Sequence, residues 1–190
     1  GSAGDFFVVK FDGQTGDQLW ADAYRGGNGF FALNGRAVDP EQNLYLGGGF
    51  NGTVSFGTLG SRTANAQDAF LLKLSPEGRA QWVRLLASGG DQAITALAAD
   101  AFGDLYLGGT FSTLLAFGGV TNSAVAQDDL FVTKLNGEGE LVWQRVFGGN
   151  GVEALKDIAL DRDERPYILA EYDRPFTLQG QLLPHAGFTD

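Results

Sequence analysis

The chain has 190 residues and a formal net charge of −10, with no cysteine and no methionine. The acidic balance and the scattered lysines and arginines argue against binding to nucleic acid or to an anionic membrane, and the missing cysteines exclude disulfides and thiolate metal sites. No apolar run approaches the roughly 18 residues of a membrane-spanning helix, so no membrane insertion is expected.

Residues 4–66 predict four short strands in succession. Residues 5–11 form the first, and a glycine-containing turn follows. The second strand carries Trp20 (QLWADAY), and a glycine-rich loop (RGGNG) separates it from the third, which ends at Asp39 (GRAVD). The fourth reads NLYLGGGF. Turn residues punctuate these segments and no 3.6-residue period is sustained between them, which indicates an all-β chain.

The same succession recurs twice more along the chain. Each unit has one tryptophan, one tyrosine, one aspartate and one lysine as landmarks: Trp20, Trp82, Trp143; Tyr45, Tyr106, Tyr167; Asp39, Asp100, Asp161; and Lys10, Lys73, Lys134. Their spacings all lie between 61 and 63 residues. This period predicts a single repeat domain over residues 1–190, with units at approximately 4–66, 67–127 and 128–190.

The first segment of each unit is apolar on both faces. One face carries Phe7, Phe70 and Phe131, and the other carries Phe6, Ala69 and Leu130. Successive side chains of a strand point to opposite faces, so this strand is expected to be covered on both sides. A two-layer sandwich would leave one face wet, whereas a propeller blade lies between two neighbours. The predicted fold class is therefore an all-β β-propeller of tandem four-stranded repeats of about 61 residues.

The remaining segments predict the order of strands within a blade. The third segment has a small residue at one position in every unit, namely Ala37, Ala98 and Ala159, which suits the crowded strand nearest a propeller axis. The tryptophan segment mixes its Trp with charged side chains such as Asp22 and Arg84, which is typical of an outer, partly wet strand. We expect the alanine-rich strand innermost and the tryptophan strand outermost.

These motifs together resemble the bacterial β-propeller repeat family SBBP. The pattern D-x-F-x-x-K, a glycine turn, Trp, Gly-Gly, A-x-D and x-L-Y-L-G-G includes DAFLLKLSPEGRAQW and DDLFVTKLNGEGELVW, and the linking stretches FGTLGSRTANAQD and FGGVTNSAVAQD are similar too. The resemblance implies a secreted or cell-surface bacterial protein and carries over no catalytic residue. The third unit departs from the pattern, with Leu169-Ala170-Glu171 where the second has Gly108-Gly109-Thr110.

A narrower resemblance concerns the first tryptophan. The sequence DGQTGDQLW, residues 12–20, is similar to the D-x-x-T-G-x-x-x-W motif of quinoprotein (PQQ-type) propellers, in which the Trp docks neighbouring blades. Only the first unit has the full motif. We therefore interpret the Trp as a structural docking residue rather than as part of a cofactor site.

The periodic aspartates are candidate ligands for a divalent ion. Asp39, Asp100 and Asp161 each end a third segment before a tight turn, and Asp163 and Glu164 add carboxylates in the third unit. The first two units supply too few acids for a calcium site. We therefore expect an Asx-type turn, in which the carboxylate accepts backbone N–H groups two residues on.

Two other features are interpreted as structural rather than functional. His185, the only histidine, lacks partners at a metal-binding or catalytic spacing, so we expect a solvated loop residue. The glycine pairs Gly26-Gly27, Gly89-Gly90 and Gly148-Gly149 are not followed by a helix that could complete a phosphate loop, so we expect sharp connections between blades. No catalytic, cofactor-binding or metal-binding residue is assigned.

The function expected is that of a non-enzymatic binding scaffold for protein or glycan, outside the cell or on its surface. One alternative is a fragment of a quinone-cofactor propeller or of another propeller enzyme, and a second is a structural spacer in a surface fibre. The absence of methionine predicts a piece of a longer protein, which would supply further blades. Otherwise, because three units are too few for a ring of four to eight blades, a homodimer could complete a six-bladed ring.

Overall fold

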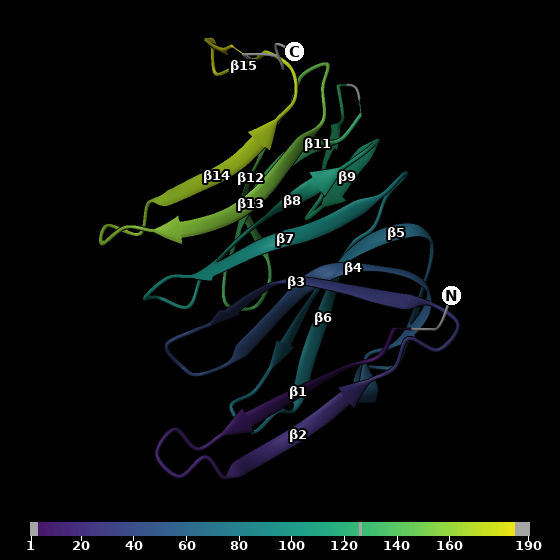
Figure 1. Cartoon of the computed structure of the whole chain (residues 1–190), viewed down its shortest axis with the longest axis vertical. Helices are drawn as coiled ribbons and strands as arrows, with labels where there is room; N and C mark the ends of the chain where they lie inside the picture. The colour runs from purple at the N-terminus through teal and green to yellow at the C-terminus, as the bar shows by residue number, and fades with distance from the viewer. Residues whose placement is uncertain (1–3, 126, 185–190) are drawn as a thin grey trace, which may run out of the picture.

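The computed structural model describes residues 4–125 and 127–184, and it confirms that this part of the chain is all-β (Figure 1). The strands are β1 (Phe6–Phe11), β2 (Gln18–Tyr24), β3 (Phe30–Val38), β4 (Leu44–Ser55), β5 (Ser61–Leu74), β6 (Ala80–Leu86), β7 (Gln92–Ala99), β8 (Leu105–Phe111), β9 (Leu114–Phe117), β10 (Val120–Ser123), β11 (Asp129–Leu135), β12 (Leu141–Phe147), β13 (Glu153–Leu160), β14 (Pro166–Tyr172), β15 (Phe176–Leu178) and β16 (Gln181–Leu183). The helical structure within the described residues is one short 3-10 turn, η1 (Gly57–Leu59).

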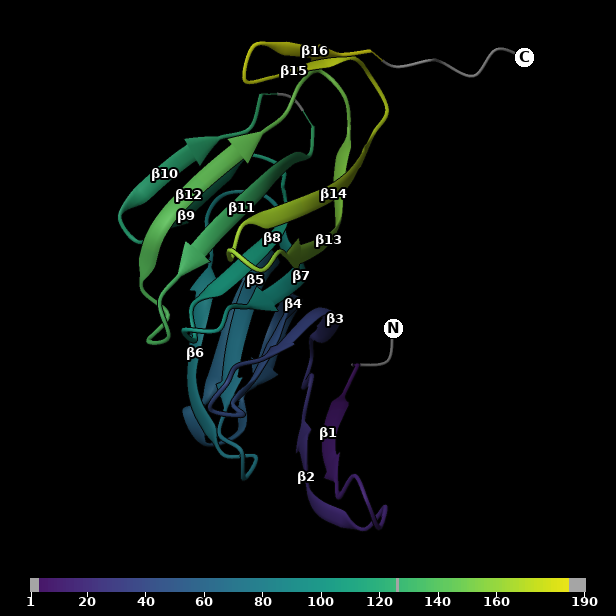
Figure 2. The ribbon, with the colours of Figure 1, turned by 90° about the vertical axis from the view of Figure 1, so that its left-hand side faces the viewer.

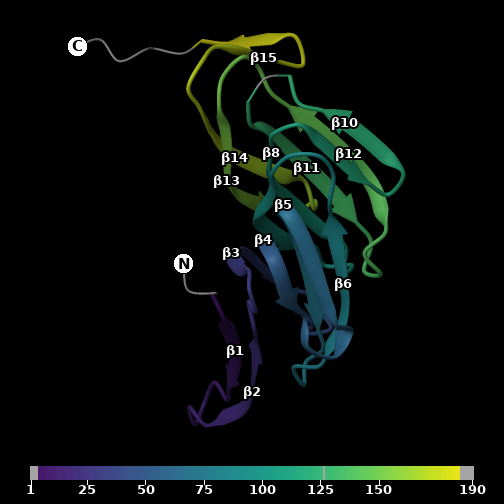
Figure 3. The same ribbon diagram turned by 90° about the vertical axis from the view of Figure 1, so that its right-hand side faces the viewer.

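Two four-stranded antiparallel sheets form the middle of the molecule. The first sheet has the order β3-β4-β5-β6, and the second sheet has the order β7-β8-β11-β12. Two-stranded sheets flank them: the N-terminal pair, β1-β2, at one end, and the C-terminal pair, β13-β14, at the other (Figure 1, Figure 3). The described sheets follow one another in a row that is open at both ends and do not close into a ring.

Each four-stranded sheet crosses a boundary between two sequence units. The third and fourth segments of one unit supply its first two strands, and the first and second segments of the next unit supply the other two. The alanine-rich strands β3 and β7 therefore lie at one edge of their sheets, and the tryptophan strands β6 and β12 lie at the other. This edge order agrees with the order expected from the side chains.

The linking stretches add strands of their own. β4 and β5 continue beyond the first sheet as a long hairpin around η1, in which Thr53 pairs with Thr63. In the second sheet the corresponding chain forms a separate hairpin, β9-β10, which lies beside β12 (Figure 2). Asn122 Nδ2 donates a hydrogen bond to Gln144 Oε1 at 2.8 Å and links this hairpin to the sheet. Buried Leu115 on β9 extends the core in this direction.

The core consists of apolar layers between successive sheets. The central strands β5 and β11 are buried on both faces, as predicted, with Phe70, Leu71, Phe131 and Val132 all excluded from solvent. β1 does not follow this prediction, because Phe7 on one of its faces is 73% exposed. Only the opposite face of β1 packs against a neighbouring sheet, the first one. An apolar first segment is therefore not enough to bury a strand on both faces, because a neighbouring sheet must also lie against each face.

Tryptophan side chains join one sheet to the next. Trp20 of the N-terminal pair lies over the β5–β6 turn of the first sheet, and its Nε1 donates a hydrogen bond to the Pro76 carbonyl at 2.9 Å. A Cβ atom at Gly78 of that turn would lie 2.7 Å from the Trp20 ring, so only glycine fits there. Trp82 covers Gly139 of the next turn in the same way, at 3.0 Å. This packing agrees with the docking role expected for these two tryptophans.

Candidate functional site

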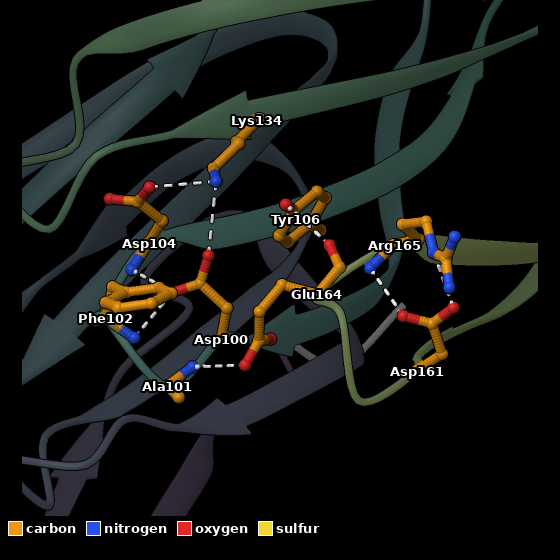
Figure 4. Close-up of polar contacts among 9 residues, drawn as sticks. All are labelled: Asp100, Ala101, Phe102, Asp104, Tyr106, Lys134, Asp161, Glu164 and Arg165. Carbon is orange, nitrogen blue, oxygen red and sulfur yellow. Dashed lines mark hydrogen bonds and ion pairs between the residues drawn. The ribbon is translucent and has the colours of Figure 1, made fainter.

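The Asx-type turn is confirmed at two of the three periodic aspartates. Asp100 Oδ1 accepts the backbone N–H groups of Phe102, at 3.0 Å, and of Asp104, at 2.9 Å (Figure 4). Its other oxygen lies 3.2 Å from the Lys134 ammonium. The carboxylate therefore fastens the β7–β8 turn and also ties it to β11.

Asp161 holds the β13–β14 turn by the same local bonds. Its Oδ1 accepts the N–H groups of Asp163, at 2.8 Å, and of Arg165, at 3.0 Å. The Arg165 guanidinium also binds the Asp161 and Asp163 carboxylates. These bonds lower the pKa of Asp161, with the backbone N–H of Arg165 as the largest cause. Of the two acids expected to assist an ion at this turn, Asp163 is thus engaged by an arginine.

Asp39 departs from the two-residue pattern. Its Oδ1 accepts the backbone N–H of Asn43, four residues on, at 2.8 Å. Its Oδ2 accepts a bond from Asn43 Nδ2 at 2.8 Å and another from the Tyr45 hydroxyl at 3.0 Å. Asp39 is buried, and these three donors satisfy its charge within the fold.

No metal-binding cluster forms in residues 4–125 and 127–184, where no group of three or more His, Cys, Asp or Glu side chains has the required arrangement. Glu164 accepts a bond from the backbone N–H of Ala101 at 3.3 Å and so links two turns rather than facing an ion site (Figure 4). His185 lies outside the described residues.

The glycine pairs lie in the connections that lead from one sheet to the next. Gly26-Gly27 joins β2 to β3, Gly89-Gly90 joins β6 to β7, and Gly148-Gly149 joins β12 to β13. Each connection takes the chain from the tryptophan strand of one sheet to the alanine-rich edge strand of the following sheet, in agreement with the sharp connections expected. Gly90 has a φ of 85°, a conformation that other residues rarely adopt.

A buried pair of carboxyl groups, which the sequence did not reveal, lies next to one glycine pair. Asp129 and Glu153 are each at most 1% exposed, and a Cβ atom at Gly148 would lie 2.1 Å from the Asp129 carboxyl carbon. Neither carboxylate oxygen of Glu153 accepts a hydrogen bond of good geometry within the described chain. Burial and then the Asp129 charge raise the pKa of Glu153, and the nearby backbone N–H of Gly149 only partly offsets this rise. The available signal was positional, since Glu153 stands 61 residues after Gln92, which is buried as a neutral amide.

Replacing Glu153 with glutamine is expected to stabilise the protein at neutral pH by about 1 kcal/mol, because it removes a buried charge. Gln92 illustrates the gain, since its Nε2 donates to the carbonyls of Gly89 and Leu114. When folding raises the pKa of a carboxyl group, the folded protein loses stability as the pH rises above the ordinary pKa of that group. The advantage of the variant should therefore grow from acid to neutral pH. Urea unfolding at several pH values measures it. Glu138→Gln, at an exposed turn, is the control that should change little.

The candidate binding site is a groove along the third-segment strands. β3, β7 and β13 lie in succession across the front of the molecule (Figure 1). Each carries a β-bulge at the same place, and the extra residues are Asn34, Thr95 and Lys156, which are 61 residues apart. Bulges re-aim side chains at functional positions. The available sequence signal was a polar residue at the same position of every third segment. That three such side chains line one groove depends on how the sheets pack.

The groove has a volume of about 310 Å³ and a mostly polar lining. The lining side chains with hydrogen-bonding groups are Asn34, Arg36, Thr95, Lys156 and Asp157. The Thr95 hydroxyl donates to the Leu155 carbonyl at 2.8 Å and ties the second sheet to the C-terminal pair. Lys156 also pairs with Glu171 at 2.8 Å on the exposed surface. Two cations, an amide and a carboxylate thus offer donors and acceptors to a polar ligand.

A scan against protein-family models found no match to the chain, and a search of curated proteins found no relative. The resemblance to the bacterial propeller repeats therefore stays a prediction that depends on the motifs alone. Within the described residues, no helix has the length and apolar character required to span a membrane.

Proposed function

We propose that this chain is a segment of a β-propeller and serves as a non-enzymatic recognition module, with its ligand bound in the groove along β3, β7 and β13. The expected ligand is a glycan or a peptide. The resemblance to bacterial propeller repeats supports an origin in a secreted or cell-surface protein.

The propeller assignment is supported by the repetition of one arrangement. Both complete sheets place an alanine-rich strand at one edge and a tryptophan strand at the other. Successive sheets pack face to face through apolar layers, and the tryptophan of one sheet covers the glycine turn of the next. Such blades are typical of rings in which the inner strands surround an axis.

The observation that carries the binding role is the polar groove. In a propeller, the edge formed by β3, β7 and β13 would face the central channel, where these folds bind ligands. Arg36 and Asn34 are exposed, and Lys156 and Asp157 are exposed beside them. The hydroxyl groups of sugars and the backbone groups of peptides can use such donors and acceptors.

The experiment is a screen of the purified chain on glycan and peptide arrays, followed by titration of the best ligand. The double variant Arg36→Ala/Lys156→Ala is expected to weaken binding at least about tenfold, as the loss of hydrogen bonds to charged groups predicts. Arg79→Ala, at an exposed turn distant from the groove, should bind like the wild type.

The alternative functions predict different experimental outcomes. A ligand whose affinity is unchanged in the double variant would contradict the groove as its site. No binding on either array would favour a structural spacer. A cofactor absorbance band in protein from its native source would favour a quinone-dependent enzyme.

A further inference from the structure

The two-stranded pairs leave unpaired strand edges that are apolar. In the N-terminal pair, the free strand β1 has Phe7 at 73% exposure and Phe11 at 56%. In the C-terminal pair, the free strand β14 has Tyr167 at 67% and Leu169 at 63%. Proteins rarely leave long apolar edges open, because such edges pair with other chains.

The complete sheets show which strand belongs on such an edge. β4 pairs with β5, and β8 pairs with β11. The fourth segment of one unit therefore pairs with the first segment of the next unit. In the first sheet Tyr45 lies opposite Lys73, which lies opposite Trp82. The Lys73 ammonium sits 5.1 Å from the centre of the Tyr45 ring, and the same row in the second sheet has a lysine 4.8 Å above its tyrosine. Each sheet therefore has a Tyr–Lys–Trp row across three strands.

A third Tyr–Lys–Trp row is split between the two ends of the chain. Lys10 lies opposite Trp20 in the N-terminal pair and has no tyrosine beside it in that sheet. Tyr167 stands on β14 at the position of the other two tyrosines, with no strand next to it in the described structure. The N-terminal pair therefore lacks the tyrosine that β14 carries, and the C-terminal pair lacks the lysine and tryptophan that β1 and β2 carry.

We propose that β14 pairs with β1 of a second copy of this chain and so completes a four-stranded sheet, β13-β14-β1-β2. The register of the two complete sheets sets the alignment. With Tyr167 opposite Lys10 of the second copy, Leu169 lies opposite Val8 and Ala170 opposite Phe7. This assembly is independent of the ligand proposed for the groove.

An apolar hollow supports this register. It has a volume of about 530 Å³ and lies between β14, the β15–β16 hairpin and the second sheet, with Leu130, Phe147, Ile168 and Ala170 in its lining. The register brings Phe7 of the second copy beside Ala170 and therefore into this hollow. Phe131, at the same place in its own unit, is fully buried in the equivalent layer between the first and second sheets.

The tryptophan docking supports the same contact. Trp20 and Trp82 each cover the glycine turn of the following sheet, at Gly78 and Gly139. At the corresponding glycine of the N-terminal pair, Gly16, a Cβ atom would meet no atom of the described chain within 4 Å, so this turn is uncovered. In the completed assembly, Trp143 would lie over Gly16 of the second copy and continue the series.

Two copies can make both contacts at once. The N-terminal and C-terminal pairs lie at opposite ends of the chain, so each copy can give β1 to its partner and receive β1 in return (Figure 1). A twofold axis relates the two contacts, which makes the interface isologous and closes the assembly. Two sheets in each copy and two shared sheets form a six-bladed ring.

Light scattering coupled to size exclusion tests the assembly. The wild-type chain is expected at twice its mass of 20.2 kDa. Phe7→Asp should abolish the dimer and leave the far-UV circular dichroism spectrum unchanged, since this side chain is exposed within one copy. Phe102→Asp changes another highly exposed phenylalanine, outside both edges, and should remain dimeric. A wild-type monomer at tens of micromolar, or assemblies larger than two copies, would overturn the closed pair.

Cysteine cross-linking tests the register, because the wild-type chain has no cysteine. The variant Val8→Cys/Leu169→Cys should form a disulfide-linked dimer under mild oxidation. The control Val9→Cys/Leu169→Cys places the two thiols on opposite faces and should cross-link at least tenfold more slowly. Equal or faster cross-linking of the control would overturn the proposed register even if a dimer forms.

Discussion

Phe70→Ala is expected to lower the free energy of unfolding by about 3–5 kcal/mol, the range for truncation of a fully buried phenylalanine. Phe70 is completely buried in the layer between the N-terminal pair and the first sheet. Its ring meets those of Phe31, Phe50 and Phe56 edge-on, with centroids 5.2 to 6.3 Å apart. The variant therefore loses apolar burial and aromatic contacts together and leaves a cavity that the remaining rigid rings cannot readily close.

Chemical denaturation followed by tryptophan fluorescence measures the change. Phe102→Ala is the matched control, because Phe102 is 83% exposed in the β7–β8 turn. This substitution should lower the free energy of unfolding by less than about 0.5 kcal/mol. A loss below about 1 kcal/mol for Phe70→Ala would contradict the packing of the N-terminal pair against the first sheet.

Trp82→Ala is expected to destabilise the chain by about 2–3 kcal/mol, somewhat less than a fully buried tryptophan, since the side chain is half-buried. Its ring covers Gly139 of the second sheet and packs against Tyr45, with centroids 5.9 Å apart. The Arg84 guanidinium lies 5.1 Å from the ring centre. Truncation removes a contact between two sheets as well as contacts within one.

Trp143→Ala provides the internal comparison. Trp143 packs against Tyr106 but covers no glycine turn within the described part of its own chain. In the monomeric Phe7→Asp background, denaturant melts should show a smaller loss for Trp143→Ala than for Trp82→Ala. Equal losses would mean that the glycine turn contributes little and that the tryptophan acts only within its own sheet.

Local sequence determined the strands and the turns. The regular turn signals and the absence of a sustained 3.6-residue period predicted an all-β chain, and the 61-residue spacing placed equivalent residues in equivalent strands. The turns at Asp100 and Asp161 were predictable because an aspartate reaches N–H groups only a few residues away. The edge position of the tryptophan strands followed from their mixed polarity.

The tertiary structure alone decided how equivalent residues differ. Phe7 and Phe131 occupy the same position in their units, yet one is exposed and the other buried, because only one has a sheet against that face. Glu153 is buried beside Asp129, and Asn34, Thr95 and Lys156 are extra residues of bulges that face one groove. These outcomes depend on strands that are distant in the sequence, so a local pattern cannot specify them. Burial and register are set by the neighbouring sheet.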